Sequence, residues 1–70
     1  MLENILVEEQ KETARELVDI LRVTQEMGRR LASETHGDLY EDVRVLNQLL
    51  HESRAKADFI QDKLLPGTAH

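Results

Sequence analysis

Apolar side chains recur at alternating steps of three and four residues on both sides of one strong break, and this spacing constrains the fold more than any other feature. Such a step pattern places side chains on one stripe of a helix, and its seven-residue period is typical of coiled coils. β-Branched residues are scattered, so strands are disfavoured. The pattern predicts an all-α protein, a two-helix antiparallel coiled-coil hairpin that an oligomer or a partner protein completes.

Glycine and proline mark the ends of the two predicted helices. Gly37 suits the left-handed position after a helix, and Asp38 suits an N-cap with Glu41 three residues on. Pro66 followed by Gly67 ends the second helix. We therefore expect residues 1–70 to form a single helical hairpin, with helix 1 at about 2–34, a turn at 35–38, helix 2 at about 39–65 and a tail at 66–70.

Gly28 leaves two interpretations of the first helix open. It costs about 1 kcal/mol in a helix interior relative to alanine, so it could end the helix early and leave Ser33 or Thr35 in a longer loop. A continuous helix is favoured by packing, because Gly28 would make room for Leu46 where the helices approach.

Folding the chain back at Gly37 predicts which residues lie between the helices. The register sets Leu31 against Val43, Gly28 against Leu46, and Leu17 against Ala57, so that large side chains meet small ones. The predicted intra-hairpin seam consists of Ala14, Leu17, Leu21, Gly28, Leu31, Val43, Leu46, Leu50, Ala57, Ile60 and Leu64.

The apolar surface is wider than one stripe, and a lone hairpin covers only one stripe per helix. A contiguous exposed apolar patch usually marks an interface, although loose packing over the hairpin's edge is the alternative. The predicted partner interface consists of Leu2, Leu6, Ile20, Val23, Met27, Val45, Leu49 and Phe59. On this division, Leu46→Ala should cost about 2–5 kcal/mol of stability, whereas Leu49→Ala should mainly weaken association.

Composition narrows the classes of function. The 70 residues contain no cysteine, so stability depends on helix packing and on burial against a partner, and a reducing cytosol suits the chain. A net charge of −5 and an aromatic content of 3% disfavour nucleic-acid binding. No apolar run approaches the length of a membrane span and no secretory signal is evident, so we expect a cytoplasmic protein without membrane insertion.

Catalytic and metal-binding patterns are not found in the sequence. The histidines, His36, His51 and His70, have no metal-ligand spacing, and His51 is interpreted as a surface residue. The acidic cluster at 8–16 has helical spacing and basic neighbours, which favours a solvated face. We expect no cofactor, no metal and no enzymatic activity.

One family resemblance rests on the order of segments in the second half of the chain. An early tyrosine follows the turn in 37–42, a leucine-rich run covers 45–50, and smaller residues include Ala55 and Ala57. This layout resembles the small helical-hairpin co-chaperones (E-type) of bacterial type III secretion needle subunits. The resemblance extends over most of the chain and implies a heterodimer with a helical-repeat chaperone that keeps a needle subunit from aggregating. It assigns no role to any single residue.

Three functions remain open from the sequence. The first is a protein–protein interaction module, such as a secretion co-chaperone or adaptor that covers a partner's apolar surface. The second is a self-assembling hairpin whose homodimer forms a four-helix bundle. The third is a small nucleic-acid-binding regulator, which the acidic net charge disfavours.

Overall fold

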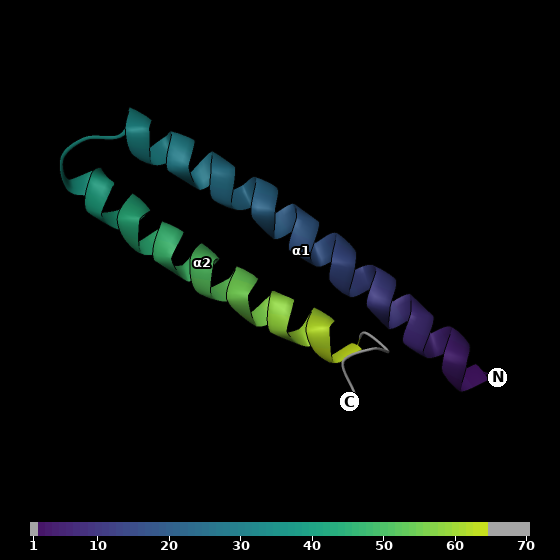
Figure 1. Ribbon diagram of the computed structural model, residues 1–70. Coiled ribbons are helices and arrows are strands. Elements are labelled where there is room, and N and C mark those ends of the chain that lie inside the picture. The colour runs from purple at the N-terminus through teal and green to yellow at the C-terminus, as the bar shows by residue number, and fades with distance from the viewer. Residues whose placement is uncertain (1, 65–70) are drawn as a thin grey trace.

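Two long helices lie side by side in opposite directions (Figure 1). The computed structural model describes the backbone of residues 2–64 and the side chains from Leu6 to Leu64. Helix α1 spans Leu2–Glu34 and helix α2 spans Asp38–Leu64. The all-α antiparallel hairpin predicted from the sequence is therefore confirmed. Helix α1 continues without interruption through Gly28, whereas the predicted tail lies outside the described residues.

The connection between the helices depends on Gly37. Its φ of 72° lies in the left-handed region, where a residue without Cβ avoids the steric penalty. Its carbonyl oxygen accepts a hydrogen bond of 3.0 Å from the Tyr40 N–H. Helix α2 begins at Asp38, one residue earlier than expected, so Asp38 lies in the first turn with Glu41. Their negative charges face the positive end of the helix dipole.

The contact between α1 and α2, called here the helix interface, follows two rows on each helix. These residues are buried or half-buried. On α1 they are Lys11, Ala14, Val18, Leu21, Gln25, Gly28 and Ala32, and on α2 they are Val43, Asn47, Leu50, Arg54, Ala57, Gln61 and Leu64.

The buried apolar core of the described residues is small. It contains Ala14, Val43 and Ala57, and no large side chain is fully buried. Fourteen large hydrophobic side chains are exposed by comparison. Two helices in contact along one narrow stripe therefore leave most of their apolar surface uncovered.

Candidate protein-docking face

The helix interface contains one of the two predicted seam rows and leaves the other outside. Ala14, Val43 and Ala57 are at most 9% exposed, and Gly28 is buried. The other row, which was predicted to be buried in the seam, is between 43% and 47% exposed and consists of Leu17, Leu31, Leu46 and Ile60. The prediction was wrong for these four residues.

The row that replaces them is mostly polar, with Val18 and Ala32 as its apolar members. Arg54 Nη1 donates a hydrogen bond of 2.9 Å to Gln25 Oε1, and Asn47 Nδ2 donates one of 3.1 Å to the carbonyl oxygen of Gly28. Among the described residues, no buried side-chain nitrogen or oxygen lacks a hydrogen-bond partner. The helices can therefore turn these polar residues inward without leaving them unsatisfied, and this rotation moves Leu17 outward.

Gly28 permits the close approach of the helices, although its nearest neighbours differ from the prediction. A Cβ at this position would collide with Asn47 Oδ1 and would lie 3.3 Å from Leu50 Cδ1. Leu46, the predicted partner, instead lies beside Gly28 around a shallow hollow at the edge of the interface. Glycine is required here by the α2 side chains that cross the interface rather than by a leucine facing it.

The four exposed residues of the predicted seam lie on one side of the hairpin, together with part of the predicted partner interface. Three shallow hollows lie along this side, and most of the large apolar residues line them. We define the apolar face as Leu6, Leu17, Ile20, Met27, Leu31, Leu46, Leu49 and Ile60, of which Ile20 is placed by its helical spacing from Leu17. Exposure within this set ranges from 43% to 62%.

The other predicted partner-interface residues are placed differently. Val23, Val45 and Phe59 are about half exposed and lie farther around their helices than the apolar face. The ring of Phe59 lies 4.9 Å from Lys63 Nζ and 5.8 Å from Lys56 Nζ, so two ammonium groups already face it. The side chain of Leu2 lies outside the described part of the chain.

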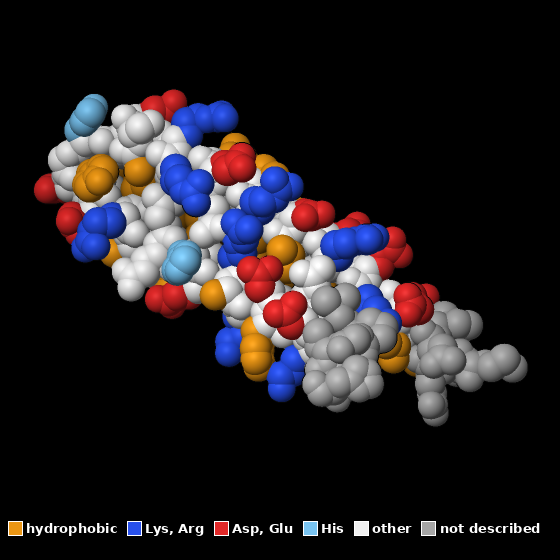
Figure 2. Space-filling model, in the orientation of Figure 1, with side chains coloured by type: hydrophobic (Ala, Val, Ile, Leu, Met, Phe, Trp, Pro, Cys, Tyr) orange, Lys and Arg blue, Asp and Glu red, His pale blue; other side chains and the backbone are white. Residues whose placement is uncertain are grey.

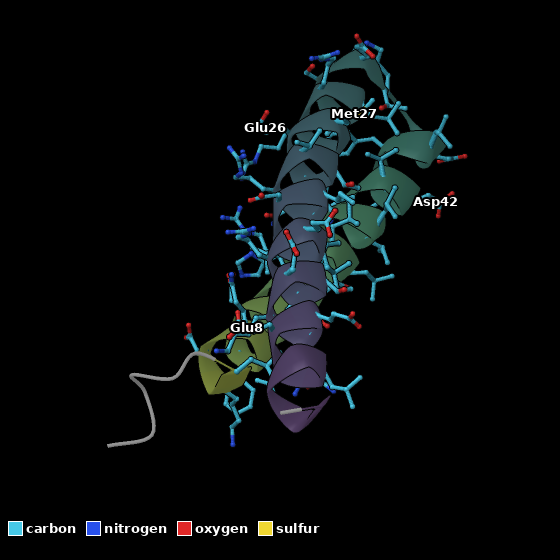
Figure 3. The ribbon with its side chains drawn as sticks, turned by 90° about the vertical axis from the view of Figure 1, so that its right-hand side faces the viewer. Glu8, Glu26, Met27 and Asp42 are labelled. Carbon is cyan, nitrogen blue, oxygen red and sulfur yellow. The ribbon has the colours of Figure 1, made fainter. Side chains whose placement is uncertain are left out.

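The opposite side of the hairpin is polar. Figure 2 shows basic and acidic side chains along most of this face, which we call the polar face. A shallow hollow here is lined by Gln25, Arg29, His51, Arg54, Ala55 and Asp58, of which only Ala55 is apolar. Figure 3 shows Glu26 pointing toward this side and Met27 pointing to the other. The hairpin is thus amphipathic as a whole, and not only helix by helix.

Four ion pairs among the described residues join neighbours within one helix. Lys11 Nζ lies 2.9 Å from Glu8 Oε1, and Arg44 Nη2 lies 3.2 Å from Glu41 Oε2. The Arg44–Glu41 pair is exposed, whereas Lys11 is half-buried in the helix interface. Exposed pairs contribute at most about 1 kcal/mol each. Because these pairs join residues of one helix, they do not link α1 to α2.

The described part of the chain contains neither a metal site nor a membrane-spanning helix. Among the side chains from Leu6 to Leu64, no group of three or more His, Asp or Glu residues is arranged to hold a metal ion. Neither α1 nor α2 has a stretch apolar and long enough to cross a membrane. Comparison with protein-family models, with curated proteins and with solved structures finds no match to this chain.

Proposed function

We propose that this protein is a non-enzymatic protein–protein interaction module, and that the apolar face is its docking surface. The observation that carries the proposal is the collection of eight large, about half-exposed apolar side chains on one side of the hairpin, opposite a charged side. Contiguous apolar surface of this kind on a small protein usually marks an interaction site.

The energetics of the hairpin support the same proposal. Its buried core is limited to small side chains, and single cores of chains this short rarely supply more than about 3–5 kcal/mol. Covering the apolar face would add the stabilisation that the helix interface lacks. A co-chaperone or adaptor that shields apolar surface on another protein is one form of this function.

Neighbouring residues on opposite sides of α1 provide the test. Met27→Lys places a charge on the apolar face, whereas Glu26→Lys places one on the polar side (Figure 3). We expect Met27→Lys to abolish association, measured as molecular mass by light scattering, and to reduce hydrophobic-dye binding by any monomer. Glu26→Lys should change neither. A wild-type monomer that binds no dye at high micromolar concentration would contradict the proposal.

A further inference from the structure

We infer that the apolar face is self-complementary and that its occupant is a second copy of this chain. The two hairpins would stack face to face with their turns at opposite ends, around a two-fold axis that passes near Thr24 and Ser53. This inference rests on the proposed function, because it names the partner of the same surface. A symmetric interface requires one patch to match itself after rotation.

The order of residues along α1 meets this requirement. Leu17 and Ile20 lie before Thr24 on the apolar face, and Met27 and Leu31 lie after it at nearly equal spacing. In an antiparallel pair of α1 helices centred on Thr24, the first two side chains lie opposite the last two of the second copy. Large apolar residues therefore meet on both sides of the axis, and the smaller threonine occupies the centre.

Helix α2 repeats the arrangement. Leu46 and Leu49 lie before Ser53, and Lys56 and Ile60 lie after it. An antiparallel pair of α2 helices centred on Ser53 sets Leu46 opposite Ile60 of the second copy. It also sets Leu49 against the aliphatic stem of Lys56, whose ammonium can reach water at the rim.

Both centres lie at the same level of the hairpin. The hydrogen bond of 2.9 Å from Arg54 to Gln25 joins the residues that directly follow Ser53 and Thr24. One axis can therefore pass close to both small residues, as a symmetric four-helix arrangement requires. If Thr24 and Ser53 were several helical turns apart along the hairpin, a single two-fold axis could not pair both α1 and α2 with their copies.

Charged residues at the rim of the face follow the same symmetry. Glu16 lies one turn before Ile20, and Arg30 lies one turn after Met27. Glu16 of one copy therefore lies opposite Arg30 of the second copy, and this pair occurs twice in the dimer. On α2, Asp42 and Lys63 are related in the same way. Within the described hairpin, neither Glu16 nor Asp42 forms an ion pair.

The rim charges also distinguish this arrangement from one with both turns at the same end. That alternative places α1 on the second copy's α2, which brings Glu34 beside Asp42 and opposes two negative charges. With the turns at opposite ends, Glu52 of one copy faces Glu52 of the second. This like-charge pair lies at a solvent-exposed rim, where water and salt screen the repulsion. The charge pattern favours opposite ends.

The size of the face fits a stable dimer. The hairpin measures 55 × 20 × 13 Å, and the apolar face extends along its longest dimension. A stable interface typically buries about 800 Å² on each partner. A face of this length and width can provide that area, so a second copy would cover a large part of the apolar residues that the monomer exposes.

Charge reversal at one rim pair tests both the partner and the geometry. Glu16→Arg and Arg30→Glu should each weaken self-association about tenfold, because each turns two attractive pairs per dimer into repulsive ones. Mixing the two variants should restore wild-type affinity, since every rim pair in the heterodimer is then attractive. Asp19→Arg and Arg22→Glu carry the matched charge changes away from the apolar face and should leave the affinity unchanged. Sedimentation equilibrium gives the dissociation constants.

Cross-linking gives a second measure of the same geometry. The chain has no cysteine, so Thr24→Cys introduces a single thiol beside the proposed axis. Mild oxidation should join two copies through this thiol, whereas Glu26→Cys on the polar side should stay unlinked. A dimer whose Thr24→Cys copies do not cross-link, or whose mixed charge variants do not regain affinity, overturns the arrangement.

The results also separate failure of this inference from failure of the docking function. A wild-type protein that is monomeric at several hundred micromolar yet binds dye through the apolar face overturns self-pairing and leaves the docking surface intact. A monomer that binds no dye overturns both.

Discussion

The side-chain amide of Asn47 donates a hydrogen bond of 3.1 Å to the carbonyl oxygen of Gly28, across the interface of two helices that are otherwise joined by few specific contacts. The same asparagine occupies the space into which a Cβ on Gly28 would project. The glycine and the asparagine therefore depend on each other. One opens the space, and the other fills it and satisfies its own polar group.

A double-mutant cycle measures this dependence. Gly28→Ala should gain about 1 kcal/mol of helix propensity but lose at least as much by displacing Asn47. In an Asn47→Ala background the displacement no longer occurs, so the alanine should be stabilising by comparison. We expect a coupling energy of about 1–2 kcal/mol, from urea unfolding followed by circular dichroism at one protein concentration. Additive effects would show that the two residues do not interact.

Gln25 and Arg54 form a second polar contact across the helix interface. Gln25 is 8% exposed, so Arg54→Ala leaves a buried amide oxygen without its donor and should cost about 1–3 kcal/mol. Replacing both residues by leucine removes the polar groups together and should restore or raise stability. We expect Arg54→Ala to unfold at a lower temperature than both the wild type and the double-leucine variant, with Asp19→Ala, exposed and away from the apolar face, as the control. A double variant less stable than Arg54→Ala contradicts the explanation.

Substitutions at Val43 and Leu46 distinguish the helix interface, which contains Val43, from the apolar face, which contains Leu46. Val43 is 5% exposed, and Val43→Ala should cost about 1–3 kcal/mol in the free energy of unfolding, even under conditions where the protein is monomeric. Leu46 is 43% exposed, so Leu46→Ala should cost much less in the monomer and should weaken association, as we also expect of Leu49→Ala. This replaces the expectation that Leu46 and Leu49 behave differently. Unfolding at low and high protein concentration distinguishes the two effects.

The turn requires glycine at position 37 because of its backbone conformation, and not because a side chain there would collide with a neighbour. Its φ is 72° and a Cβ there would meet nothing within 4 Å. Gly37→Ala should therefore destabilise the hairpin by about 1–2 kcal/mol, and Gly37→Asn by less, because asparagine tolerates the left-handed region. Chemical denaturation of both variants gives the comparison. Equal stability of the alanine variant and the wild type would show that the turn can relax to another conformation.

The sequence by itself determined the two helices, the turn at Gly37 and the antiparallel direction of the chain. These features depend on local properties: the three-and-four spacing of apolar residues, a glycine at the break and acidic residues at the start of α2. Ala14, Gly28, Val43 and Ala57 could also be placed between the helices, because small residues and a heptad period suffice to locate one row.

Only the tertiary structure decided the rotation of each helix about its axis. The sequence favours burying Leu17 and Leu46, because each helix taken alone gains most from its most apolar stripe. In the hairpin, Gln25 and Arg54 satisfy each other across the interface, and so the polar row can turn inward at little cost. That rotation gathers the leucines on the apolar face. Contacts between residues that are distant in the sequence set the rotation of each helix about its axis. The spacing of residues along one helix cannot predict this rotation.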